Sequence, residues 1–596
     1  MGLCRNLCLL IPVAVTMLPG CPEEPRGGMG DGAGDGPGAL RGDAWGTLHD
    51  AVAPLERDGA APPGDGAPPG GSAGTASRIP GLFHPVAGGS GSGVAGAGSN
   101  GVIDLGTSEC FNRPTTRLWE LPDGRYKRPF VVKGAVGQTY DLRGVMVEAN
   151  PLQYPVLLDD PHDTCVVGVT VQGQQPRGMT WHQVKTDGKY HLTDGDGVGW
   201  ESSTGKLILE GAWIDNMEDG VGPPFDLVPD PTSTWSLRHV YMRYIRDDAI
   251  EDDGCLSGEV IDSFFDGIWT FVSSRPSKAA RTDVNGQSTI TVRDSLIRHI
   301  CMPDPRDKNN GCGSKTGTGE LFKSGSNCKL KVNMKDTVIL KEGARKGDDF
   351  LPGTYSNVTL IWAGGGSWPG GKLPPGVKLT TDKTVWNKAR ADWIKRHGCD
   401  SKAENCTFLH QAGIKKIPPP NTQPYVVLAT SPAYVPLTNG SGIMWWTENV
   451  SSCKASGKDF AVSGASGGMR VWSNSVVQPL FQLSCTAADG SVVSDSDRSI
   501  WFDISSDKTK PATPSSVKAS GGPGAITLTW KESSDNFAVA SYRVYRDGTW
   551  ITTVSGKPVY HDAAVTPGTS YTYEVQAFDS FGNLSGKSPA ASATAQ

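Results

Sequence analysis

The sequence predicts an all-β protein: a right-handed parallel β-helix followed by two small β-sandwiches. A unit made of a short hydrophobic strand and an acidic turn recurs between residues 207 and 300. From about residue 101 to 366, strand-like runs of four to six residues alternate with turns rich in Gly, Asp, Asn and Pro. Two further β-rich stretches follow, at 425–505 and 511–596. Repeats of about 20–50 residues imply a stacked architecture.

The repeat has four recognisable copies: 207–221, 237–250, 260–268 and 290–300. Candidate strand starts lie 23 to 40 residues apart, near Leu209, Leu237, Val260, Val292, Val332 and Val358. Turn insertions explain this irregular spacing. A β-propeller would need four antiparallel strands per blade and more uniform units, whereas a β-sandwich remains the main alternative.

The chain of 596 residues is too long for one domain. We expect six segments: a signal peptide (1–21), a disordered Gly- and Pro-rich tether (22–100), a β-helix (101–380), a helix with a disulfide loop and linker (381–424), and two sandwiches (425–508 and 509–596). The net charge of −6 and the lack of a basic cluster argue against a nucleic-acid partner.

The N-terminus predicts export. Arg5 precedes an apolar core, Leu9 to Leu18, which is too short to span a bilayer. The following Leu-Pro-Gly-Cys resembles the lipobox of bacterial lipoproteins, which implies lipidation at Cys21; an ordinary cleaved signal is the alternative. We expect an extracellular or outer-surface monomer whose membrane contact is the lipid anchor.

Cysteine usage agrees with export. Ten cysteines remain after the signal peptide and Cys21 are set aside, and an even number in an exported chain favours disulfides. The sequence has no CxxC pair. We predict the bridges Cys399–Cys406 and Cys453–Cys485, because each pair lies within one local unit.

Residues 382–397 predict a helix. Val385, Trp386, Ala389 and Trp393 fall on one stripe, and Gly398 is a stop signal. We expect this helix to pack on the solenoid as a cap or strut.

The last two segments resemble known sandwich families. Residues 443–453 and 481–490 resemble a bacterial immunoglobulin-like repeat with one cysteine pair. Residues 526–530, 541–548 and 566–577 resemble a fibronectin type III domain. That resemblance implies a core role for Trp530 and a corner tyrosine at Tyr571. Such copies are often appended to secreted carbohydrate-active enzymes.

The repeat also aligns acidic residues. Equivalent positions in successive coils stack about 4.8 Å apart. Alignment of the copies places Asp219, Asp247 or Asp248, Asp266 and then Arg298 in one column, and Asp215, Arg243, Asp262 and Asp294 in another. Stacked carboxylates repel unless they bind a cation, share protons or face water.

Three interpretations of the first column compete. It is catalytic, it binds structural Ca²⁺ through oxygen ligands, or its acids are solvent-facing turn residues. The general architecture resembles pectin-lyase-like enzymes, which implies hydrolysis by acids or Ca²⁺-dependent elimination with an Arg or Lys base. Candidate catalytic residues are Asp219, Asp248, Asp266, Arg246 and Arg298. Candidate metal ligands are Asp247, Asp252 and Asp253.

Aromatic and basic side chains near these acids are candidates for sugar contacts: Trp213, Tyr244, Trp269 and Arg275. For any single aromatic residue, a place in the core is the commoner role. His239 and His299 also lie in repeat copies, and either is a candidate base or a hydrogen-bonded structural histidine.

The sequence therefore predicts a surface-anchored protein that binds, and as an enzyme would cleave, an extracellular polysaccharide as a lyase or glycoside hydrolase. Ca²⁺ is the only cofactor expected. The alternative is a non-enzymatic adhesin or stalk with Ca²⁺-stabilised acidic turns.

Overall fold

The computed structural model describes His84, Pro85 and most of residues 108–596. Within 108–596 its gaps are 114, 134, 150–153, 160, 181–182, 185–195, 202–204, 223–232, 253, 276–287, 303–310, 313–317, 326–327, 345–349, 400–420, 432–433, 438–439, 476, 503–507, 523, 536–538, 555–557, 563 and 580–582. The predicted signal peptide, the lipidation site Cys21, the metal candidate Asp253 and the disulfide candidate Cys406 lie outside the described residues. So does the predicted tether, apart from His84 and Pro85, which form a short strand.

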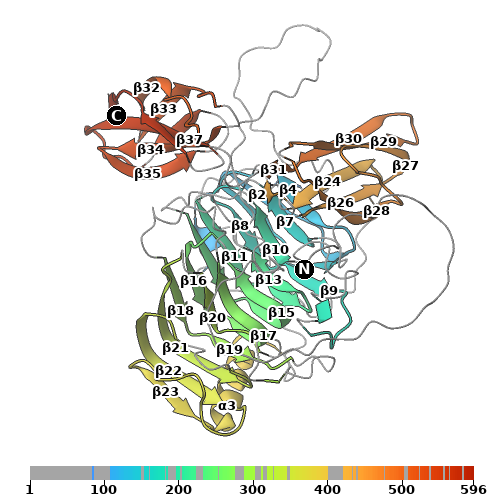
Figure 1. Ribbon diagram of the computed structural model, residues 1–596, viewed down its shortest axis with the longest axis vertical. Coiled ribbons are helices and arrows are strands. Elements are labelled where there is room, and N and C mark those ends of the chain that lie inside the picture. Colours follow the sequence, from blue (N-terminus) through green and yellow to red (C-terminus); the bar gives the residue numbers. More distant parts are fainter. Residues whose placement is uncertain are drawn as a thin grey trace, which may run out of the picture. The chain divides into compact units, whose positions relative to one another are not determined.

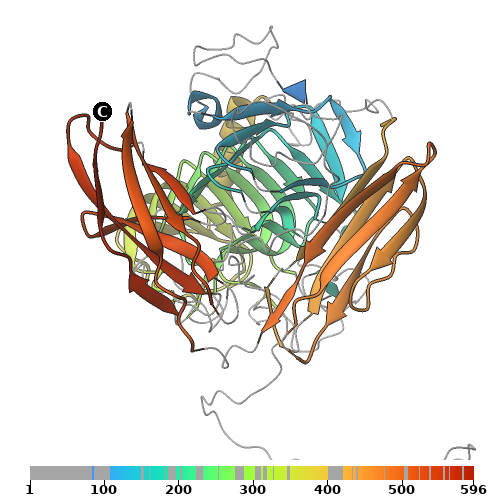
Figure 2. The same cartoon turned by 90° about the horizontal axis from the view of Figure 1, so that it is seen from above.

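The first half of the described chain is a long parallel sheet whose strands form three ladders. Each pass of the chain up to β20 adds one strand to each ladder, and the last passes extend the first two ladders, so strands far apart in sequence lie side by side (Figure 1). Figure 2, turned by 90°, shows the blue-to-green strands of successive passes one behind another. This parallel order excludes a β-sandwich for this region.

The first ladder contains β2 (Arg117–Glu120), β5 (Gln138–Asp141), β8 (Cys165–Val167), β11 (Lys206–Glu210), β14 (Thr234–Arg238), β16 (Ser257–Ile261), β18 (Thr289–Arg293) and the first parts of β21 (Lys331–Lys341) and β22 (Gly353–Trp362). The short strand β1 (His84–Pro85) pairs antiparallel with β2. Leu209, Leu237, Val260 and Val292 occupy equivalent positions, as the repeat predicted.

The second ladder contains β3 (Gly124–Tyr126), β6 (Val145–Ala149), β9 (Thr170–Gly173), β12 (Trp213–Asp215), the first parts of β15 (Tyr241–Glu251) and β17 (Phe264–Ser274), β19 (Leu296–His299), the later parts of β21 and β22, and β23 (Val377–Thr380). The third contains β4 (Phe130–Lys133), β7 (Val156–Asp159), β10 (Asp196–Glu201), β13 (Asp219–Gly222), the later parts of β15 and β17, and β20 (Phe322–Ser324).

One hydrophobic cluster takes side chains from all three ladders, among them Leu209, Met242 and Val221. β-Branched and aliphatic residues suit a strand that is buried on its faces. The ladders therefore share a single apolar core.

A second cluster covers the opposite face of the first two ladders. Trp213, Tyr241, Phe264 and Leu296 are register partners in successive strands and form a column there. Helix α3 (Lys383–Arg396) buries this column with Trp386, Trp393 and Ile394. The predicted helix and its packing role are thereby confirmed.

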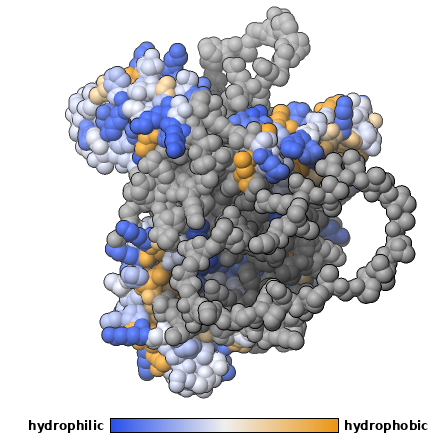
Figure 3. All heavy atoms as spheres, viewed as in Figure 1, coloured by the Kyte–Doolittle hydropathy of each residue, from blue (hydrophilic) through white to orange (hydrophobic). Residues whose placement is uncertain are grey.

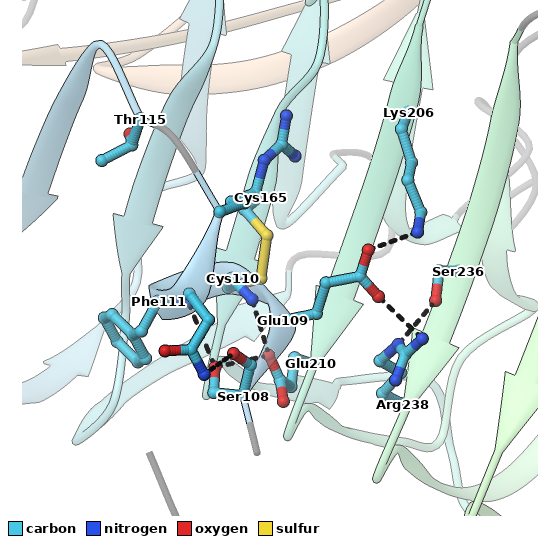
Figure 4. Close-up of a disulfide and its surroundings, with 12 residues drawn as sticks. Ser108, Glu109, Cys110, Phe111, Thr115, Cys165, Lys206, Glu210, Ser236 and Arg238 are labelled. Carbon is cyan, nitrogen blue, oxygen red and sulfur yellow. Dashed lines mark hydrogen bonds and ion pairs between the residues drawn. A yellow bond between two sulfur atoms is a disulfide. The ribbon is translucent and has the colours of Figure 1, made fainter. Parts of the chain in front are cut away.

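Helix α1 (Glu109–Asn112) is fixed to the same face (Figure 4). A disulfide joins Cys110 to Cys165 on β8. The Ser108 hydroxyl and the Cys110 amide both donate to Glu210 Oε2, at 2.8 and 3.2 Å. These contacts attach residues 108–110 to the first ladder.

The turns between the first and second ladders form a column of left-handed residues. His239, Asp262, Asp294 and Asp336 have φ of 53°, 42°, 56° and 47°. His, Asp and Asn are the non-glycine residues that adopt this conformation most readily. The predicted second column is right for Asp215 and Arg243, which are register partners. It is wrong for Asp262 and Asp294, which lie in the turns, and the next partner of Arg243 is Asp266.

The region from 425 to 502 is an antiparallel sandwich. One sheet contains β24 (Tyr425–Ser431), β26 (Gly440–Glu448) and β28 (Ser466–Trp472), and the other β27 (Val450–Ser456), β29 (Leu480–Ala487) and β30 (Val492–Arg498); β25 (Tyr434–Pro436) pairs with β31 (Ile500–Phe502). The predicted Cys453–Cys485 disulfide is confirmed. It joins cross-strand partners of one sheet, unlike the inter-sheet bridge of immunoglobulin domains.

The C-terminal sandwich has one sheet of β32 (Ser515–Gly522), β33 (Ala525–Lys531) and β36 (Val559–Asp562), and another of β34 (Val539–Arg546), β35 (Thr549–Val554), β37 (Ser570–Asp579), β38 (Leu584–Lys587) and β39 (Ala591–Thr594). Trp530 lies in its core, and the Thr566 amide donates to the Tyr571 hydroxyl at 3.0 Å. Both roles match the prediction. The face of this sandwich seen in Figure 3 is mostly hydrophilic.

Disulfides also join Cys255 to Cys328 and Cys301 to Cys312. Cys399 is disulfide-bonded as well, while its predicted partner Cys406 is outside the described residues.

Candidate functional site

Acidic side chains gather on and next to three neighbouring third-ladder strands, β10, β13 and β15. Two overlapping groups, Asp196–Asp219–Glu251 and Glu218–Asp219–Asp247, place carboxylate oxygens within 4.8 Å of one another. We call these five residues the acidic cluster. Asp219 belongs to both groups and is therefore its centre.

Strand register creates this cluster. Asp196 of β10 is the direct partner of Asp219 on β13, and Val221 on β13 pairs with Ile250 on β15. The Asp248 amide donates to Asp219 Oδ1 at 2.8 Å. The register shifts between Ile245 and Asp248, and such bulges re-aim side chains. The cluster thus depends on an irregular step in β15.

The backbones of β13 and β15 also approach each other closely beside the acidic cluster. A Cβ on Gly220 would lie 2.4 Å from the carbonyl oxygen of Ala249 on the neighbouring strand. Only glycine lets β13 approach β15 this closely, beside Asp219.

Most of the cluster is buried. Glu218, Asp219 and Asp247 are each less than 5% exposed, whereas Glu251 is half-buried. Buried carboxylates this close repel unless they share protons or bind a cation. An all-oxygen donor set suits a hard cation such as Ca²⁺ or Mg²⁺. The residues present therefore fit the Ca²⁺ that the sequence suggested, and they include the predicted ligand Asp247.

A lysine lies at the edge of the cluster. Lys323 Nζ on β20 is 3.1 Å from Asp248 Oδ2, and both side chains are largely buried. Asp219 and Asp248 are thus neighbours in one ladder, as predicted, and Lys323 adds a positive charge beside them.

Asp266 and Arg298 lie elsewhere. They are register partners in the second ladder, with Arg298 Nη1 3.2 Å from Asp266 Oδ1. Arg298 also contacts Glu342 at 2.8 Å, and Arg390 of α3 lies 3.7 Å from Asp266. Burial lowers the pKa of Arg298, but the nearby carboxylates of Glu342 and Asp266 raise it by more, so the net shift is upward. The predicted single column of Asp219, Asp248 and Asp266 is wrong, because Asp266 pairs with Arg243 in the second ladder, whereas Asp248 pairs with Thr270 in the third.

Arg246 is a structural residue. Its fully buried guanidinium donates to the carbonyl oxygens of Pro176, Met179 and Met217 and to Asn216 Oδ1. Burial lowers its pKa to about 10. These bonds hold Arg246 to the backbone and contradict its predicted role as a base or substrate clamp.

Two of the predicted sugar-binding aromatics are also buried. Trp213 packs edge-on against Tyr241, with ring centroids 4.5 Å apart, and Trp269 packs with Ile300 and Met302. Their exposed fractions are 1% and 3%. Neither ring presents a face to a ligand, so the prediction is wrong for both.

Tyr244 and Arg275 are partly exposed. The Tyr244 hydroxyl donates to the Met179 carbonyl at 3.1 Å, and Arg275 lies 3.7 Å from Glu320. They stay candidates for substrate contacts.

The metal candidate Asp252 has a different role. Both of its carboxylate oxygens accept the Leu256 amide at 3.1 Å, and its side chain is buried. Asp252 therefore caps a turn and lies in neither carboxylate group found among the described residues, so its assignment as a ligand stays a prediction.

The candidate site residues predicted from the sequence do not include Asp196, Glu218 or Lys323. Asp196 stands 23 residues before Asp219, so an earlier copy of the repeat would have revealed it. Lys323 joins the cluster across 75 residues, for which no local signal exists.

Comparisons with known proteins concern a small part of the chain. No protein-family model matches it. An alpha-amylase of Niallia circulans is 38% identical over 89 residues, which are 15% of this chain and 7% of the amylase. Chitinase A1 of the same organism is 39% identical over 93 residues, 15% of this chain and 13% of the chitinase. The solved "Structure of FN3tt mut" is 27% identical and covers 14% of this chain and 97% of its own, with a TM-score of 0.13.

The chain spans between 3% and 24% of the length of the curated relatives it matches. These matches fall in the fibronectin III-like part, which confirms that part of the predicted architecture. Within the described part of the chain, no helix is both long and apolar enough to cross a bilayer.

Proposed function

We propose that this is an exported protein that binds and cleaves an acidic extracellular polysaccharide at the acidic cluster, with Ca²⁺ as cofactor. The observation that carries this proposal is a group of converging carboxylates with Lys323 and Asp248 beside it. In this proposal the three ladders are the faces of a right-handed parallel β-helix, the architecture of pectin-lyase-like enzymes.

In this proposal the carboxylates bind the cation and the lysine acts on the substrate. Asp196, Glu218, Asp219, Asp247 and Glu251 would hold Ca²⁺, which when bound would attract a uronate carboxylate. Glu251 is half-buried and lies at the edge of the cluster, so a substrate would approach the cation on that side. Lys323 is the candidate base that would take the proton from the carbon next to that carboxylate. The C–O bond at the following carbon would then break, a C=C bond would form, and the leaving sugar oxygen would take up a proton.

The other parts of the chain support an extracellular setting. The disulfides are typical of exported proteins. Relatives of the fibronectin III-like part include a chitinase and an alpha-amylase. We propose Cys21 as the lipid anchor and the sandwiches as spacers or adhesion modules.

A second function is favoured by the burial of the cluster. Glu218, Asp219 and Asp247 are shielded from solvent, which suits a structural cation. The protein would then be a Ca²⁺-stabilised adhesin or stalk without catalytic activity.

A panel of acidic and neutral polysaccharides tests the proposal. Cleavage is measured both as new reducing ends and as absorbance of unsaturated sugars, after EGTA treatment and after addition of Ca²⁺. We expect unsaturated products from an acidic glycan only with Ca²⁺. Asp219→Asn keeps the acceptor for the Asp248 amide but removes one charge, so it should abolish cleavage and weaken Ca²⁺ binding.

Asp266→Asn is the matched control, because it removes a carboxylate from the second ladder and should leave both activities intact. A wild-type chain whose melting temperature rises with Ca²⁺, but which releases no product, would be an adhesin. Equal activity in wild type and Asp219→Asn would reject the site.

A further inference from the structure

Three side chains from distant segments meet at the C-terminal end of helix α3. Asp262 Oδ2 lies 3.3 Å from His239 Nδ1 and 3.1 Å from His397 Nε2. One candidate metal-ligand atom from each residue lies within 4.8 Å of the other two. This His239–Asp262–His397 group is separate from the acidic cluster.

The fold fixes each member. His239 and Asp262 occupy successive positions of the left-handed turn column, and the His239 amide donates to the Ile261 carbonyl at 3.0 Å. His397 caps α3 and stacks on Trp393, with ring centroids 3.9 Å apart. The geometry is therefore held by backbone and packing before any ligand binds.

The tautomer of His397 is set by its second nitrogen. Nδ1 lies 2.8 Å from the carbonyl oxygen of Trp393, and a carbonyl can only accept, so Nδ1 carries the proton. In neutral His397, Nε2 then has a lone pair aimed at a carboxylate oxygen. Two acceptors 3.1 Å apart repel unless a proton or a metal ion lies between them. Metal-bound histidines commonly donate a hydrogen bond from the N–H of their other ring nitrogen to a carbonyl oxygen in this way.

Arg396 orients the Asp262 carboxylate toward the two imidazoles. Arg396 Nη2 lies 2.6 Å from Asp262 Oδ1, which leaves Oδ2 to face the imidazoles. Ligand atoms about 2.0–2.1 Å from a tetrahedral Zn²⁺ are about 3.3–3.4 Å apart, close to the two separations seen here. The end of a helix of 14 residues also attracts a cation.

We propose that His239, Asp262 and His397 form a site for a divalent transition metal of the Zn²⁺ type. Two imidazole nitrogens and a carboxylate suit Zn²⁺ better than Ca²⁺, which prefers oxygen. The fourth position is open to water or an external ligand. The metal joins α3 to two successive turns of the sheet.

The test uses the full-length chain, freed of metal with EDTA and then titrated with Co²⁺ in excess Ca²⁺, which keeps the acidic cluster filled. We expect d–d absorption bands of four-coordinate Co²⁺, displaced by Zn²⁺. His239→Gln and His397→Gln should each abolish the bands, and Arg396→Gln should weaken binding about 10–100-fold.

His162→Gln is the matched control, because His162 and Asp163 form a His–Asp pair elsewhere, with Nε2 and Oδ2 3.1 Å apart. It should keep the bands, and circular dichroism checks that each variant is folded. Absence of the bands in wild type, including the case where only protons bind, overturns the proposal. So do bands that persist in folded His239→Gln and His397→Gln. Loss of polysaccharide cleavage alone does not bear on this site.

Discussion

At the scale of single residues, the charges outside the acidic cluster form ion-pair networks that hold strands together. Glu259 on β16 accepts from the Ser236 hydroxyl and from Arg238, at 2.8 and 2.7 Å, and Arg238 also contacts Glu109 of α1 (Figure 4). Burial raises the pKa of Glu259, but the bonds from Ser236 and Arg238 outweigh it and hold the pKa below its usual range.

This shift predicts an acid dependence of stability. A folded-state pKa below the unfolded value of about 4.3 gives a contribution that is present above that pH and is lost as the pH falls through the folded value. Glu259→Gln should therefore lower the melting temperature at pH 7 and approach wild type near pH 2–3. The measurement is thermal unfolding by circular dichroism at a series of pH values.

Glu574→Gln provides the control, since Glu574 forms a surface ion pair with Lys587 at 3.0 Å and surface pairs contribute little. A Glu259→Gln difference that stays constant from pH 7 to pH 2 would contradict the argument.

The sequence predicted some residue roles and missed others for physical reasons. Asp219 and Asp248 could be paired because both follow the hydrophobic segment of a repeat copy. Asp266 could not be excluded, because β15 and β17 each run through two ladders, and the sequence does not show to which ladder an acidic residue belongs. The fixed role of Arg246 depends on carbonyls up to 70 residues away, which no local pattern encodes.

At the scale of elements, helix α3 covers a hydrophobic column that includes Trp213, one of the residues that the sequence suggested for sugar contacts. Its amphipathic stripe and stop signal predicted the helix, but not which strands it covers, because that contact spans more than 100 residues. Trp393 is 1% exposed and packs against Tyr241 and Phe264.

Trp393→Ala should therefore destabilise this part of the chain by about 3–5 kcal/mol, the cost of truncating a buried tryptophan. The measurement is denaturant unfolding in EDTA, so that no bound metal contributes. Lys395→Ala, on the exposed side of the same helix, should change stability by less than about 0.5 kcal/mol. Similar values for both variants would mean that α3 does not stabilise the sheet beneath it.

At the scale of the whole molecule, the sequence predicted the order of the parts because each part has its own short-range pattern. The repeat encodes the parallel ladders, and the fibronectin III-like motifs encode an antiparallel sandwich with a separate core. The acidic cluster was only half predicted, since it needs strands from several passes of the chain at once.

Separate cores predict separate unfolding transitions, and the acidic cluster predicts which of them depends on Ca²⁺. Calorimetry of the full chain should show one transition that rises with Ca²⁺ and falls with EGTA. At about 100 times the dissociation constant, binding should stabilise that part by about 2.7 kcal/mol. Leu528→Ala, in the core of the C-terminal sandwich, identifies the second transition by lowering its temperature. Ca²⁺ should not move this second transition. A Ca²⁺ shift confined to the transition that Leu528→Ala lowers would place the cation in the sandwich and remove the structural basis for a site at Asp219.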